Sequence, residues 1–293
     1  MSQTNDYLEL VRAPAVLTVL GDTIAGGSAA GHRLGGRRML LPVASACLYA
    51  GGMALNDYAD RGIDARERPE RPIPSGRITP KKALTAAAAL TAAGLSLSAA
   101  GGGRRSLAVG LPLAAAIWTY DLVAKGHPVS GAVTMGCCRA LDVLMGAGSA
   151  HLRPALGAAG IMGAHTVAVT VLSHGEVEGT TTTTASGVAA GTGLVAGAVL
   201  AGSAGPRNQV LPVLLATAFY AARCAPAQVR AARNPLPKNA LEATKAGIRA
   251  MVPLQTALTL RQGNLVAAAV LASVDLFGKV LRSRPRKLRI SES

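Results

Sequence analysis

The sequence has few charged residues for its length. Asp, Glu, Lys and Arg make up 15% of the 293 residues, whereas a typical soluble domain has about 25%. Segments 13–31, 83–103 and 187–205 carry almost no charge. Because about 20 mainly apolar residues can cross the hydrocarbon core of a bilayer, this shortage predicts a polytopic helical membrane protein. An Ala-rich soluble helical bundle is the alternative.

Acidic residues and cysteines are also scarce. The chain has 15 acidic residues against 30 Lys and Arg, and its formal net charge is +15. The basic residues form no single binding face and no nucleic-acid-binding motif is present, so we expect no nucleic acid as a partner. The four cysteines lack metal-ligand spacing, and we expect small buried thiols rather than disulfides.

The spacing of apolar and basic segments predicts the topology. Apolar segments occur near 13–31, 39–57, 83–102, 106–122, 129–150, 155–173, 185–204, 208–225, 240–260 and 264–281. They predict an all-α transmembrane bundle of about nine helices, between eight and ten. The whole chain, 1–293, would form one domain with a basic cytoplasmic tail at 283–293. With the N-terminus in the cytoplasm, 19 Lys and Arg lie inside and 8 outside. This bias follows the positive-inside rule and predicts a multi-pass plasma-membrane protein.

A dense charged stretch, LNDYADRGIDARERPERPIPSGRITP at 55–80, interrupts the apolar pattern. Asn56, Asp60 and Asp64 are spaced four apart and would share an ~80° arc of a helix, with Asp57 one step round. Hard oxygen ligands of this kind suit Mg²⁺, which proteins hold with a few carboxylates and substrate phosphates. The stretch therefore predicts a Mg²⁺ site on the cytoplasmic side of the membrane.

The arginines that follow these acids predict a phosphate partner. They are Arg66, Arg68, Arg71 and Arg77. A guanidinium group matches the geometry of phosphate oxygens, so acids and arginines together favour a diphosphate site whose lipid tail enters the bundle. The alternative is a solvated loop whose arginines only fix the topology.

The sequence NDYADRGID resembles the NDxxDxxxD signature of UbiA-type intramembrane prenyltransferases. The segments ERPERPIPSGRIT and LELVRAPAVLTVLGDTIAG are also similar to that family, and the resemblance extends over nearly the whole chain. It implies a helical bundle, usually of nine spans, around a central cavity open to lipid. It also implies Mg²⁺-dependent transfer of a prenyl group from a prenyl diphosphate to a small acceptor, with Asp60 and Asp64 as catalytic residues.

The segment TYDLVAKGHP is similar to the family's middle signature, a Tyr followed by a Lys at a cytoplasmic helix end. It supplies Tyr120 and Lys125, one residue further apart than in many members. The resemblance implies catalytic roles for both. We expect Tyr120 to line the cavity and Lys125 to bind the diphosphate, although Lys125 could also serve the positive-inside rule alone.

The family's second metal signature, often DxEGD, is altered here. In LSHGEVEGTTTTTASG, Glu176 takes the first acidic position, Glu178 matches the central glutamate, and Thr180 replaces the last aspartate. The resemblance implies Glu176 and Glu178 as metal ligands, while the change leaves open one or two Mg²⁺ ions. This segment and 232–263 resemble the EboC-like branch of the superfamily. That similarity points to a polyol acceptor, whereas the family's usual acceptor is aromatic.

One more ionisable residue falls inside an apolar segment. Arg139 lies in TMGCCRALDVLMG, three residues before Asp142. Ionisable groups inside membranes are costly and usually face a partner or a cavity. Arg139 is therefore expected either to pair with Asp142 or to face the cavity and bind the diphosphate.

Two other functions remain open at this stage. A UbiA-type terpene cyclase would act on the prenyl diphosphate without an acceptor, and the altered second signature is compatible with it. A non-catalytic protein that binds or transports an isoprenoid lipid would keep the fold without the chemistry. The intact first signature favours an enzyme.

Overall fold

The computed structural model describes residues 3–202 and 207–283, and these residues form helices and turns without a strand. The predicted all-α class is therefore confirmed. The elements are α1 (Gln3–Leu10), η1 (Ala13–Thr18), α2 (Leu20–Ala29), η2 (Gly36–Met39), α3 (Leu40–Glu67), α4 (Pro80–Leu122), η3 (Ala124–Gly126), α5 (Pro128–Ala147), η4 (Ser149–His151), α6 (Leu152–Ser173), α7 (Thr182–Ala201), α8 (Arg207–Arg233), α9 (Pro237–Leu260) and α10 (Leu265–Ser283).

The predicted spans 83–102 and 106–122 are the two arms of α4. Gly103 separates them with φ 68°, a left-handed conformation that glycine adopts without steric cost. The two arms pack antiparallel. A hydrogen bond between them shows this: the Trp118 indole N–H donates to the Thr91 hydroxyl at 3.2 Å. The Thr79 side chain caps the first arm by accepting from the backbone N–H of Lys82, as expected at a helix start.

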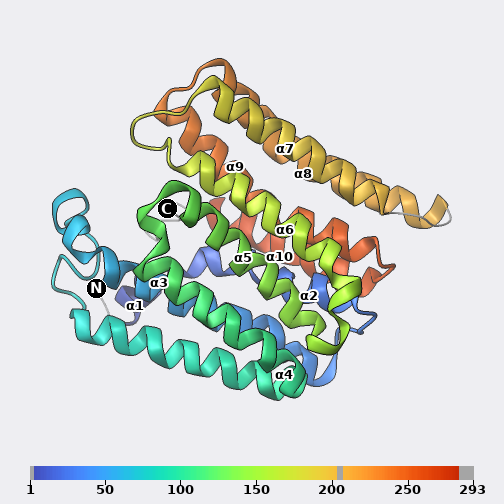
Figure 1. Cartoon of the computed structure of the whole chain (residues 1–293), viewed down its shortest axis with the longest axis horizontal. Helices are drawn as coiled ribbons and strands as arrows, with labels where there is room; N and C mark the ends of the chain where they lie inside the picture. Colours follow the sequence, from blue (N-terminus) through green and yellow to red (C-terminus); the bar gives the residue numbers. More distant parts are fainter. Residues whose placement is uncertain (1–2, 203–206, 284–293) are drawn as a thin grey trace.

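The helices together form a bundle. The α7–α8 pair runs along one outer edge, and α4 runs along the opposite edge (Figure 1). Among the described residues, six helical segments are long and apolar enough to cross a membrane. The chain is thus an integral membrane protein with several spans. The predicted tail at 283–293 lies, apart from Ser283, outside the described residues.

Helices α2 and α5 approach each other closely near the end of α5. A Cβ atom on Gly26 would overlap the Val143 carbonyl, and one on Gly146 would overlap the Thr23 carbonyl. Small residues commonly permit such contacts between membrane helices. This contact brings the first and fifth apolar segments together.

The described cysteines form no disulfide. Cys138 and Cys224 are buried, as expected, while Cys47 is half-buried and Cys137 is exposed. The expectation of buried thiols is therefore wrong for Cys137, which lies on the outer face of α5.

Candidate functional site

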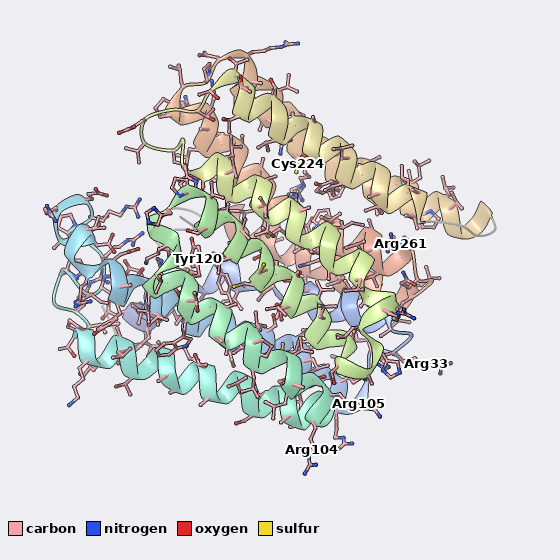
Figure 2. The ribbon with its side chains drawn as sticks, viewed as in Figure 1. Arg33, Arg104, Arg105, Tyr120, Cys224 and Arg261 are labelled. Carbon is pink, nitrogen blue, oxygen red and sulfur yellow. The ribbon has the colours of Figure 1, made fainter. Side chains whose placement is uncertain are left out.

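A cavity of about 380 Å³ lies in the bundle between α3, α4, α5, α6 and α9, with η1 at its edge. Apolar side chains such as Leu48, Leu113, Val169 and Ile248 line its middle. Charged residues gather where α3 and α4 end, on the side where Tyr120 is marked in Figure 2. The cavity therefore joins an apolar chamber to a charged mouth.

The four predicted metal ligands of α3 lie in two different environments. Asn56 and Asp60 line the cavity. Asp57 and Asp64 are buried at 4% and 3% exposure and face Arg71, whose Nη1 lies 3.4 Å from Asp57 Oδ1 and 2.7 Å from Asp64 Oδ2. Asp57 and Asp64 thus hold Arg71 on the cavity wall, while Asn56 and Asp60 themselves line the cavity.

The end of α4 completes this side of the mouth. The Asn56 amide donates to Asp121 Oδ1 at 3.2 Å, and Lys125 Nζ lies 2.7 Å from Asp60 Oδ1. Tyr120 and Asp121 both line the cavity. Asp121 was not among the predicted site residues; its place beside Tyr120 in the middle signature was the signal that could have found it.

The predicted phosphate-binding arginines do not all reach the cavity. Arg68 and Arg71 line it, whereas Arg66 is exposed and does not. Arg77 pairs with Glu9 and Asp6, at 2.7 and 2.8 Å. The hydrogen bond with Glu9 contributes most to a raised pKa of Arg77, and the hydrogen bond with Asp6 adds to it. Arg77 therefore anchors α1 to the loop after α3, and its predicted place in the diphosphate site is not what the structure shows.

Arg12 takes a place at the cavity that the site prediction omitted. It lines the cavity and its Nη2 lies 3.4 Å from Asp57 Oδ1. It sits in the left-handed region with φ 47°, directly before η1. The resemblance of this Arg-x-Pro segment to the family was the signal that could have identified it.

The opposite side of the mouth comes from α6 and α9. Glu176, which follows the end of α6, lines the cavity with Thr244 and Lys245. Burial raises the pKa of Glu176, while a hydrogen bond with Thr244 and the charges of Lys245 and Arg68 oppose this shift. Glu178 is exposed and is not part of the cavity wall.

Arg139 lies on the cavity wall but pairs with a residue that the sequence analysis did not consider. Its guanidinium forms a buried ion pair with Asp22 and donates to the Thr18 carbonyl at 3.1 Å. Asp142 instead accepts a hydrogen bond from Ser45. Of the two alternatives for Arg139, the structure has the place on the cavity wall. The pair with Asp142 is replaced by Arg139–Asp22, which joins α5 to α2.

The oxygen atoms at the mouth suit a divalent cation that a phosphate ligand helps to hold. Among the described residues, no three His, Cys, Asp or Glu side chains converge as a complete metal site. Asn56, Asp60 and Asp121 nevertheless lie together, and Mg²⁺ is usually held by one or two carboxylates plus substrate phosphates and water. This donor set fits Mg²⁺ bound together with a diphosphate.

Glu176→Gln is expected to lower turnover about 10- to 150-fold, since one charged hydrogen-bonding group is worth roughly 1.5–3 kcal/mol. Initial rates of diphosphate release at saturating Mg²⁺ would measure this. Glu178→Gln is the matched control, and we expect it to stay within about twofold of the unchanged protein. A Glu176→Gln rate equal to that of the control would remove Glu176 from the site.

The fold and site define a class of protein: a polytopic helical membrane protein whose apolar cavity has a mouth of carboxylates and cations. Residues 19–240 match the UbiA prenyltransferase family. The chain belongs to this family, as the resemblance in its first signature predicted.

The curated relatives include digeranylgeranylglyceryl phosphate synthases of archaea. That of Methanopyrus kandleri is 38% identical over 128 residues, which cover 43% of this chain and 46% of the relative. That of Methanothrix thermoacetophila is 36% identical over 141 residues, which cover 47% and 52%. The chain thus matches about half the length of these relatives.

Solved structures support the fold over almost the whole chain. A UbiA homologue from Archaeoglobus fulgidus bound to GPP and Mg²⁺ superposes with a TM-score of 0.64 at 15% identity, covering 93% of this chain and 99% of that one. A structure described as a digeranylgeranylglyceryl phosphate synthase in membranes gives a TM-score of 0.55 at 18% identity, covering 89% and 99%.

Proposed function

We propose that this protein is a Mg²⁺-dependent intramembrane prenyltransferase that moves a prenyl group from a prenyl diphosphate to a small hydroxyl-bearing acceptor. The observation that carries the proposal is the cavity itself. Its apolar chamber fits an isoprenoid tail, and its mouth combines Asn56, Asp60 and Asp121 with the cations Arg68 and Arg71.

Each side of the mouth has a role in this proposal. Asn56, Asp60 and Asp121 would hold Mg²⁺, with Glu176 as a further oxygen ligand from the opposite side. When bound, Mg²⁺ supplies positive charge to the leaving diphosphate. Arg71 is held toward the cavity by Asp57 and Asp64 and binds the diphosphate oxygens, while Lys125 positions Asp60 through its 2.7 Å ion pair.

The reaction follows from this arrangement. The bond between the prenyl carbon and the diphosphate oxygen breaks, and its electron pair leaves with the diphosphate. The acceptor hydroxyl oxygen forms the new bond to that carbon, and its proton passes to the released diphosphate. The apolar chamber keeps water from the developing cation, and the Tyr120 ring on the wall stabilises it.

A glyceryl phosphate fits the proposed acceptor better than an aromatic acid. The curated relatives are named digeranylgeranylglyceryl phosphate synthases. The mouth also contains Arg68 and Lys245 besides Arg12 and Arg71, and these cations can bind the phosphate of such an acceptor. We place this mouth on the cytoplasmic side of the plasma membrane, because the basic loop 61–82 lies there under the positive-inside rule.

The deciding experiment measures Mg²⁺-dependent diphosphate release by the purified protein in detergent. Geranyl, farnesyl and geranylgeranyl diphosphates would be offered with and without glycerol phosphate or a prenylglyceryl phosphate, and the lipid products analysed. The expected result is release that depends on a glyceryl phosphate and yields a prenyl ether. Release without any acceptor, with a cyclic product, would instead show a terpene cyclase. Donor binding without release under any condition would show a binding protein.

A further inference from the structure

The end of the bundle opposite the site is rich in arginine and, among the described residues, has no acidic residue. Six of its arginines lie on the loop before α3, the kink of α4 and the start of α6. We call them the arginine patch: Arg33, Arg37, Arg38, Arg104, Arg105 and Arg153. Three of them, Arg33, Arg104 and Arg105, are marked in Figure 2 at the end away from Tyr120. The chain segments that reach this end, such as 23–56 and 143–175, contain no Asp or Glu.

Three turns bring these arginines together. Arg38 Nη1 donates to the Gly146 carbonyl at 3.0 Å, which ties the loop before α3 to the end of α5. A Cβ on Gly148 would lie 3.3 Å from Arg105 Cβ, so the kink of α4 contacts the same turn. His32 adds an edge contact with the His151 ring, with centroids 5.1 Å apart. The patch is therefore one surface.

The arginines lie where the backbone already attracts anions. Arg37 and Arg38 immediately precede α3, Arg104 and Arg105 begin the second arm of α4, and Arg153 lies in the first turn of α6. Neither α3 nor α6 has a side-chain cap or an acid in its first turn. Cations at helix N-termini oppose the helix dipole, whereas an anion there is favourable. A bound anion would offset both the repulsion between arginines and the dipole.

A small cavity within the patch offers a place for an oxygen atom of such an anion. It has a volume of about 20 Å³ and is lined by His32, Arg33, Arg38, Ser28 and Thr23, among others. The Thr23 hydroxyl is buried at 3% exposure and has no hydrogen-bond partner within the described part of the chain. A cavity of this size holds one water-sized group, which Thr23 and the two arginines can hydrogen-bond.

We propose that the arginine patch binds the phosphate head group of an anionic membrane phospholipid. The patch lies where α3, α5 and α6 begin or end. These helices are long and apolar enough to cross a membrane, so we expect lipid head groups to surround their ends. Arginine binds phosphate oxygens through two parallel hydrogen bonds, and the patch contains no lysine. The site is separate from the prenyl diphosphate mouth and does not depend on the proposed function.

The test compares two triple variants that remove equal charge. Arg33→Gln/Arg104→Gln/Arg105→Gln changes the patch, and Lys81→Gln/Lys82→Gln/Lys238→Gln removes three exposed cations elsewhere. The thermal midpoint of each protein in neutral detergent would be measured while phosphatidylglycerol, phosphatidylcholine or inorganic phosphate is added. Native mass spectrometry would count the phosphatidylglycerol molecules retained.

The expected result is a rise in midpoint with phosphatidylglycerol for the unchanged protein and for the lysine variant. The patch variant should bind phosphatidylglycerol about 100-fold more weakly. Each of the three arginines is expected to contribute roughly fivefold to the affinity for an anionic lipid. Equal retention by both variants would overturn the proposal. An equal rise with phosphatidylcholine, or with inorganic phosphate alone, would also overturn it. The comparison of lipids on the unchanged protein holds even if a variant does not fold.

Discussion

Asp60→Asn is expected to lower diphosphate release by about 10³-fold, near the upper effect of removing one group that stabilises a leaving anion. Among the residues that the structure describes, Asp60 is the only carboxylate of α3 that lines the cavity. It is also one of the proposed Mg²⁺ ligands. The change keeps the shape of the side chain but removes its charge. Mg²⁺ would be held more weakly, and Lys125 would lose its 2.7 Å partner. Initial rates over a Mg²⁺ series would measure the loss.

The control for Asp60→Asn is Asp275→Asn. Asp275 also pairs with a cation at 2.7 Å, Arg223, but it lies on α10 and does not line the cavity. We expect its rate to stay within about twofold, because partly exposed ion pairs contribute roughly 0–1 kcal/mol. An Asp60→Asn protein that releases diphosphate as fast as this control would disprove the proposed metal site.

Asp60 and Arg77 show how far sequence reasoning reaches this site. The spacing of Asn56 and Asp60 on one helix was visible in the sequence, since helical periodicity is a local property. The partner of a long charged side chain depends on which element packs beside it. Arg77 meets Glu9 and Asp6 because α1 folds back on the loop after α3. Nothing in the local spacing of 66–77 indicates that contact.

The fold shows the same difference between local patterns, which the sequence reveals, and long-range contacts, which it does not. Residue composition located the helices, and a glycine-rich stretch at 101–103 separated two spans that the structure joins in one hairpin at Gly103. The contact between α2 and α5 depends on two glycines 120 residues apart, Gly26 and Gly146. Because that contact is long-range, the ion pair that it creates between Arg139 and Asp22 could not be predicted from the three-residue spacing of Arg139 and Asp142.

Arg139→Met is expected to lower the free energy of unfolding by about 3–5 kcal/mol, the usual cost of leaving one buried charge without its partner. Asp22 is fully buried at 0% exposure. Without Arg139, the Gln255 amide still donates to Asp22 at 2.7 Å, but no cation balances the buried charge. Unfolding of the purified protein in mixed micelles, followed by circular dichroism, would measure the change.

A double variant separates the buried charge from simple loss of packing. Asp22→Asn/Arg139→Gln removes both charges and leaves two polar side chains that can hydrogen-bond each other, so most of the lost stability should return. Arg223→Gln breaks the more exposed pair with Asp275, whose side chains are 23% and 16% exposed, and should cost less than about 1 kcal/mol. If the double variant were as unstable as Arg139→Met, packing rather than charge would explain the effect. If Arg139→Met cost no more than Arg223→Gln, the Arg139–Asp22 pair would contribute little to joining α2 and α5.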